Sequence, residues 1–254
     1  MSSSKKTILF TACASVVLLV LTYLITVNTE AGFITINSIW LSNTFFLAFF
    51  GGMFASMVVV LLCEIQRFCA LKRSMENYMF LHARNLYRFL FQLQQNINDF
   101  QTHPNQEIPQ SFEDNLLAQA QNEVNALLGV DYMRLSAKNS LLVGHQKILS
   151  GLEQRMLPVN QGKSAFWISY ILTKMDRIKN SDGSILTCED TQIKSALSAQ
   201  QKHITNVLEF VEEYLELIDG ECKDRFSWKL NKASIESSYV SIFEAWSLDE
   251  YLKA

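Results

Sequence analysis

The sequence predicts an all-α protein, in which a hairpin of two transmembrane helices is followed by a long stalk helix and a cytoplasmic helical bundle. Three observations lead to this fold class. Between Thr7 and Cys63 the only charged side chain is Glu30. The whole chain contains nine Gly and three Pro, which are too few turn residues for a sheet-rich fold. From Glu64 onward, apolar residues recur at helical spacing among frequent charges.

Two stretches of the N-terminal region, Ile8–Val27 and Thr44–Cys63, carry no charge. A helix of about 20 apolar residues crosses the roughly 30 Å hydrocarbon core of a bilayer, so we expect residues 1–63 to form a transmembrane hairpin. For the first stretch a signal peptide is the alternative, because Lys5 and Lys6 precede it. The apolar run is longer than the apolar region of a signal peptide, which favours an uncleaved anchor.

Basic residues predict the orientation of the two spans. Lys5 and Lys6 precede the first span, while the connection between the spans contains no base. Arg67, Lys72 and Arg73 follow the second span. The positive-inside rule therefore predicts a multi-pass protein of the inner or plasma membrane with both termini in the cytoplasm. We expect these bases to contact anionic lipid headgroups.

The polar residues of the first span share one helical face, which consists of Thr11, Ser15, Thr22 and Thr26. Two interpretations remain open. The hydroxyls bond to carbonyls of the preceding turn and this face closes the hairpin, or the face lines a water-filled path through an oligomer.

The second span carries small residues at the spacing of helix-packing motifs, namely Gly51, Gly52, Ala55 and Ser56. Small residues let two helix backbones approach closely in a membrane. We expect this face to support oligomerisation of the chain.

Residues 64–102 are predicted to form a stalk helix that continues the second span, because no Gly or Pro occurs between Gly52 and Pro104. Apolar residues along the stalk alternate between spacings of four and three, which is a heptad seam. The seam consists of Met79, Ala83, Leu86, Leu90, Leu93, Ile97 and Phe100. We expect it to enter the helical bundle and also to contribute to self-association.

Residues 103–254 are predicted to form the cytoplasmic helical domain. Apolar periodicity and capping residues predict helices near 111–129, 141–156, 166–178, 191–218 and 235–246. Pro158 is expected to separate the second of these from the third.

Motifs that carry chemistry are incomplete in this chain. Gly162-Lys163-Ser164 resembles the end of a phosphate-binding loop, but Leu157 stands where its first Gly belongs. Residues 178–189 resemble an EF-hand loop, but Ile178 replaces the first Asp. The four His and five Cys lack metal-ligand spacing. We therefore expect no metal, no cofactor and no catalytic residues, although catalytic residues distant in the sequence leave a membrane-anchored enzyme as a third reading.

The charge balance bears on the partners. Acids outnumber bases from Glu64 onward, so we expect no direct nucleic-acid binding. A protein is the expected cytoplasmic partner. The acidic, aromatic run 244–252 either packs into the bundle or docks on a basic partner.

The predicted layout of hairpin, stalk and soluble domain resembles the small two-span membrane effectors of bacterial anti-phage systems, such as those carried by retrons. The resemblance is one of architecture and involves no shared sequence motif. It implies that a partner, in a retron a reverse transcriptase with its RNA and DNA product, controls the cytoplasmic domain. It also implies that the spans then oligomerise and permeabilise the membrane. A passive membrane tether or scaffold for a cytoplasmic complex is the alternative.

Overall fold

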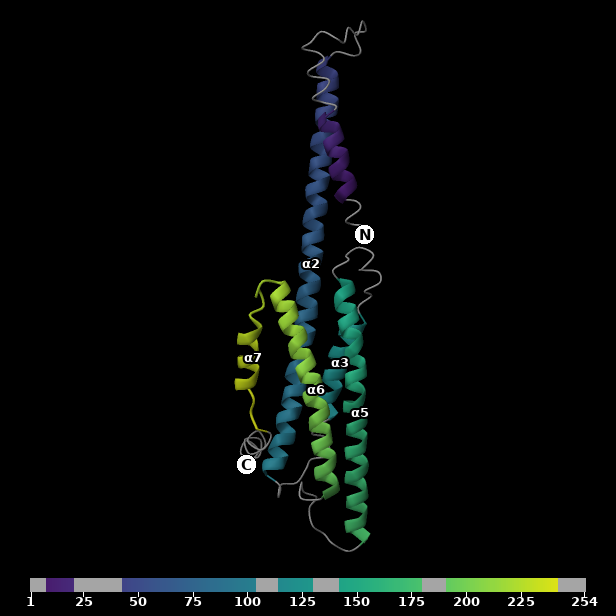
Figure 1. Ribbon diagram of the computed structural model, residues 1–254, viewed down its shortest axis with the longest axis vertical. Coiled ribbons are helices and arrows are strands. Elements are labelled where there is room, and N and C mark those ends of the chain that lie inside the picture. Colours follow the sequence, from purple (N-terminus) through teal and green to yellow (C-terminus); the bar gives the residue numbers. More distant parts are fainter. Residues whose placement is uncertain (1–7, 21–42, 104–113, 130–141, 180–190, 242–254) are drawn as a thin grey trace, which may run out of the picture. The chain divides into compact units, whose positions relative to one another are not determined.

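The structure is a computed structural model, which describes residues 8–20, 43–103, 114–129, 142–179 and 191–241 (Figure 1). All regular secondary structure in these ranges is helical, and they contain no strand. The prediction of an all-α fold is therefore confirmed for this part of the chain. The helices are Ile8–Val20, α2 (Asn43–Thr102), α3 (Asp114–Leu128), α5 (Leu142–Lys179), α6 (Thr191–Glu221) and α7 (Trp228–Ser237).

The chain divides into two compact units. Unit 1 comprises Met1–Met75 and Asp131–Val143, and unit 2 comprises Glu76–Val130 and Gly144–Ala254. Helix α2 is continuous across the boundary between Met75 and Glu76. It is 60 residues long, as expected for a segment without Pro and with Gly only near its start.

Helix α2 is, among the described residues, the one helix long and apolar enough to cross a membrane, judged from Gly51 onward. The helix Ile8–Val20 is also apolar, but it is shorter than a span. The remainder of the first predicted span, residues 21–27, lies outside the described residues.

The predicted heptad seam forms the central layer of unit 2. None of its seven residues, from Met79 to Phe100, is more than 1% exposed. Polar contacts show that α3, α6 and α7 neighbour this part of α2, and that α5 lies against α3 and α6 (Figure 1). The seam therefore packs inside its own chain. This burial leaves no free surface on the seam for a second copy, so the packing gives no support to the expected role of the seam in self-association.

Helix α5 corrects the expectation that Pro158 separates two helices, because it runs unbroken for 38 residues with this proline inside. Met156, Val159 and Phe166, on either side of the proline, all lie in the core. Burial of this continuous apolar face outweighs the one helical hydrogen bond that the missing proline N–H removes.

Gly162 of α5 lies against α6. A Cβ at this position would lie 1.9 Å from Oε1 of Gln200, a fully buried side chain of α6. The Gln200 amide donates a hydrogen bond to the Val159 carbonyl at 3.0 Å. Gly162 thus permits a close helix contact, and Gly162-Lys163-Ser164 lies within a helix rather than in a phosphate-binding loop.

Candidate functional site

In the helix Ile8–Val20, Thr11 and Ser15 are buried, at 7% and 6% exposure. The Thr11 hydroxyl donates to the Ile8 carbonyl at 3.1 Å, and the Ser15 hydroxyl donates to the Thr11 carbonyl at 2.8 Å. Both hydroxyls are therefore satisfied within their own helix, which favours the packing interpretation for these two residues. Thr22 and Thr26, the other members of the polar face, lie outside the described residues.

The small residues of α2 are open in the single chain. Gly52, Ala55 and Ser56 are exposed and Gly51 is half-buried, and a Cβ at either glycine would meet no atom within 4 Å. The Ser56 hydroxyl is bonded to the Gly52 carbonyl at 2.9 Å. These two residues line a shallow apolar groove on α2 together with Ala48, Phe49, Met53, Met57 and Val60.

The basic residues after the predicted second span lie on α2. Arg67 and Arg73 are exposed and Lys72 is half-buried. Lys5 and Lys6 lie outside the described residues. A headgroup role for these five bases stays a prediction.

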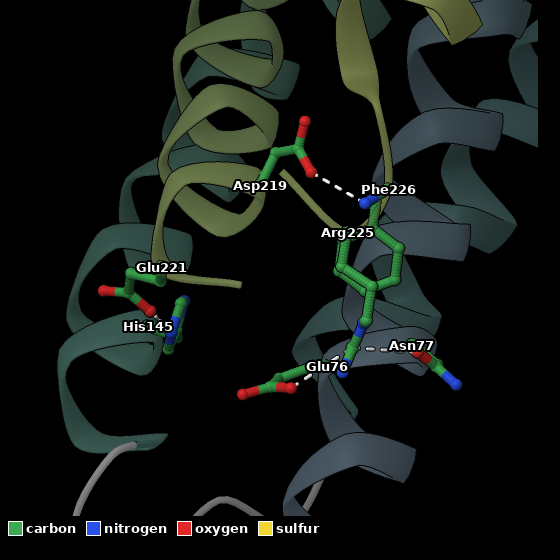
Figure 2. Close-up of polar contacts among 7 residues, drawn as sticks. All are labelled: Glu76, Asn77, His145, Asp219, Glu221, Arg225 and Phe226. Carbon is green, nitrogen blue, oxygen red and sulfur yellow. Dashed lines mark hydrogen bonds and ion pairs between the residues drawn. The ribbon is translucent and has the colours of Figure 1, made fainter. Parts of the chain in front are cut away.

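Unit 2 contains a polar arrangement that the sequence analysis missed, in the connection between α6 and α7. The buried carboxylate of Asp219, in the last turn of α6, accepts a hydrogen bond from the backbone N–H of Phe226 at 2.8 Å (Figure 2). It also accepts one from the backbone N–H of Trp228 at 2.7 Å. Lys223, Asp224 and Ser227 of this connection have φ angles of 58°, 56° and 50°. Each left-handed residue of this kind costs about 1–3 kcal/mol and persists only where the surrounding structure imposes it. The Asp219 carboxylate is the group that holds this connection in place.

Arg225 joins the same connection to α2. Its guanidinium donates to Oδ1 of Asn77 at 3.0 Å and pairs with Oε2 of Glu76 at 3.1 Å (Figure 2). It also lies over the Phe226 ring, 4.4 Å from the centroid. The Phe226 ring in turn stacks on Phe80 of α2, with centroids 4.2 Å apart and planes at 6°.

Trp228 completes this contact as a buried side chain at the start of α7. Its indole meets Phe80 and Tyr87 edge to face, at 6.3 and 5.1 Å between centroids. We call the four residues Asp219, Arg225, Phe226 and Trp228 the α6–α7 clamp. Its partners on α2 begin at Glu76, the first residue of unit 2.

A second contact ties α6 to the start of α5. The His145 imidazole is buried, with Nε2 3.0 Å from Oε2 of Glu221 (Figure 2). Its ring meets Tyr214 edge to face. The end of α6 is therefore fixed to α5 through Glu221 and to α7 through Asp219.

Tyr87 of α2 lies among charged groups of α6 and α7. Its hydroxyl donates to Oε1 of Glu236 at 3.2 Å. Burial raises the pKa of Tyr87 far above its ordinary value, and the negative charges of Glu212 and Glu236 raise it further. Lys232 pairs with both carboxylates. Tyr87 is thus held as a neutral hydrogen-bond donor, which suits a structural role better than that of a catalytic base.

The His, Cys, Asp and Glu side chains in the part of the chain that the structure describes bear on metal binding. No group of three or more His, Cys, Asp or Glu side chains there is arranged to hold a metal ion. His82 and His145 each contact a single carboxylate, Glu123 and Glu221 respectively. The EF-hand-like loop lies largely outside the described residues.

The buried seam residues could be predicted from their periodicity, whereas the α6–α7 clamp has no periodic signal. Asp219 and Arg225 belong to a short polar segment after Ile218. The partners of Arg225 on α2, Glu76 and Asn77, lie more than 140 positions earlier in the chain. No protein-family model, curated protein or solved structure matches this chain.

Proposed function

We propose that the protein is a non-enzymatic membrane effector. Two spans, at about residues 8–27 and 44–63, anchor it in the inner membrane with both termini in the cytoplasm. The helical unit 2 binds a cytoplasmic protein partner that controls what the spans do. The observation that carries the proposal is the continuity of α2, whose N-terminal part is apolar and whose C-terminal part is the central layer of unit 2.

Exposure along α2 supports the membrane assignment. Phe49, Val59 and Leu62 each expose about half of their surface, and the apolar window of the helix is not buried inside the chain. A surface of this kind is stable against lipid tails and unfavourable in water. Arg67, Lys72 and Arg73 then lie where lipid headgroups would meet the helix.

We propose that the spans act as an oligomer, joined through the groove at Gly52 and Ser56. Within the described part of the chain, a Cβ at Gly52 would meet no atom within 4 Å, and small residues of this spacing allow two helices to approach closely. Because Thr11 and Ser15 are bonded within their own helix, self-association through α2 is better supported than a path lined by these hydroxyls.

Anti-phage defence is the process that we propose for this effector, with a reverse transcriptase and its nucleic acid as the partner complex. Support for it comes from the layout of apolar spans and a charged helical unit. The excess of acids over bases from Glu64 onward favours contact through protein rather than through nucleic acid.

The experiment is replacement of both spans by an unrelated transmembrane hairpin of equal length. Cells producing the natural chain at high level are expected to lose membrane potential, measured with a potential-sensitive dye, and to stop growing. Cells producing the replaced chain at the same level are expected to keep both. Equal loss of membrane potential with the two chains would show that the natural spans are not required for it. An intact potential with both chains would contradict permeabilisation and would instead identify a passive tether.

A further inference from the structure

We propose that the α6–α7 clamp is a latch on helix α2, and that opening of this latch is the event through which unit 2 acts on the membrane segment. The inference rests on the proposed function, because it supplies the regulation of the same helix. It concerns residues that play no part in spanning the membrane or in the groove.

The latch contacts α2 where this helix enters unit 2. Glu76 and Asn77 are the first two residues that α2 contributes to unit 2, and Met79 is the first buried residue of the seam. Arg225 therefore grips α2 in the turn where unit 2 begins (Figure 2). Phe226 and Phe80 add a stacked aromatic contact one turn further along. A change at this point bears directly on the part of α2 that continues toward the apolar segment.

Asp219 of α6 holds the residues of the latch in position. The Asp219 carboxylate binds the N–H groups of Phe226 and Trp228, and the Asp219 carbonyl accepts from the Asp224 N–H at 2.8 Å. These bonds impose the left-handed residues of the connection and thereby present Arg225 to α2.

The ion pair and hydrogen bond of Arg225 with α2 are weaker than the bonds that Asp219 makes within the latch. The Arg225 side chain is 35% exposed and that of Glu76 is 19% exposed, so water screens their attraction. The bonds to Asp219, in contrast, are made by a buried carboxylate. A partner that binds near this edge is therefore expected to release Arg225 from Glu76 and Asn77 while the connection keeps its shape.

The test compares Arg225→Ala with Arg155→Ala in the full chain. Arg155 is the matched control, because its guanidinium also lies over an aromatic ring, that of Phe210 at 4.3 Å, but donates a hydrogen bond to the Gly151 carbonyl of its own helix. Hydrogen exchange of the purified chain in detergent reports on the opening of α2. Membrane potential in cells without any trigger reports on its consequence.

For Arg225→Ala we expect exchange at Glu76–Ala83 to rise by about tenfold or more, with exchange at the seam beyond Leu90 unchanged. We also expect membrane potential to be lost at a lower expression level than with the natural chain. Arg155→Ala is expected to change neither. Arg225→Lys keeps the charge, so its exchange and its membrane potential should lie between those of Arg225→Ala and the natural chain. A melting temperature close to that of the natural chain shows that unit 2 remains folded in each variant.

Unchanged exchange at Glu76–Ala83 would overturn the latch. Faster exchange without loss of potential at a lower expression level would overturn the proposed effect of the latch on the membrane segment. Arg225 would then make a structural contact only. The natural chain at high expression separates this failure from that of the proposed function. If it depolarises cells and Arg225→Ala adds nothing, only the latch is overturned, whereas intact potential in both overturns the proposed function on which the latch rests.

Discussion

The carboxylate of Asp219 and the backbone N–H of Trp228 lie 2.7 Å apart, so the last turn of α6 fixes the residue at which α7 begins. Oδ1 of the same carboxylate holds the Phe226 N–H. One buried side chain thus satisfies two backbone donors in a connection with three left-handed residues. Charge-assisted hydrogen bonds of this kind are the strong ones in proteins.

Replacement of Asp219 by Ala should destabilise unit 2. It leaves the buried N–H of Trp228 and the N–H of Phe226 without their acceptor, and we expect a loss of about 2–4 kcal/mol in the free energy of unfolding. Asp219→Asn keeps one acceptor oxygen and should lose about half as much. Chemical unfolding in detergent measures both values. Asp176→Ala, an exposed aspartate on α5, is the control, and an equal loss in that variant would contradict the assignment.

Replacement of Gly162 by Ala should also destabilise the protein. The added Cβ would lie 1.9 Å from Oε1 of Gln200, so this buried side chain must move and lose its bond to the Val159 carbonyl. We expect a cost of about 1–3 kcal/mol. Adding Gln200→Ala should recover part of it. Gly144→Ala, where a Cβ meets nothing within 4 Å, should be neutral or slightly stabilising, and thermal unfolding distinguishes the two glycines.

The stability of unit 2 should fall at alkaline pH because of Tyr87. The pKa of Tyr87 is raised in the folded state, so the unfolded chain loses this proton first. The stabilisation is complete below the unfolded pKa of about 10 and is lost as the pH rises above it. Tyr87→Phe should flatten the decline of the unfolding midpoint between about pH 9 and 11, at a cost of about 1 kcal/mol at neutral pH. If Tyr78→Phe flattens it as much, the assignment to Tyr87 is wrong.

Enlarging Gly52 should weaken self-association. Gly52→Leu fills the groove that Ser56 and Met53 also line, and we expect the crosslinked fraction in membranes to fall by about fivefold or more, equivalent to roughly 1 kcal/mol. Val58→Leu adds bulk outside the groove and should leave crosslinking unchanged. An undiminished oligomer in Gly52→Leu would exclude this face as the interface.

The sequence was sufficient to predict the buried face of the C-terminal half of α2. The seam from Met79 to Phe100 is fully buried, because apolar residues at spacings of three and four must share one side of a helix. The same pattern did not reveal what covers that side. A seam filled by α3 and α6 of the same chain has the same spacing as a seam filled by a second copy.

Pro158 shows where local reasoning about a helix was insufficient. Proline removes one hydrogen bond and favours a break, but Met156, Val159 and Phe166 bury a continuous face across it. Whether α5 breaks depends on the packing available to both halves, and the neighbours that provide this packing are distant in the sequence.

The sequence by itself determined the helical class, the uncharged N-terminal segments and the buried face of α2, because each depends on composition or on periodicity within one segment. Only the tertiary structure decided that the seam is buried by helices of its own chain and that Gly52 and Ser56 are exposed. It also decided that Arg225 contacts Glu76 and Asn77. These facts depend on which surfaces of distant segments bury each other, and single polar contacts between such segments leave no periodic signal in the chain.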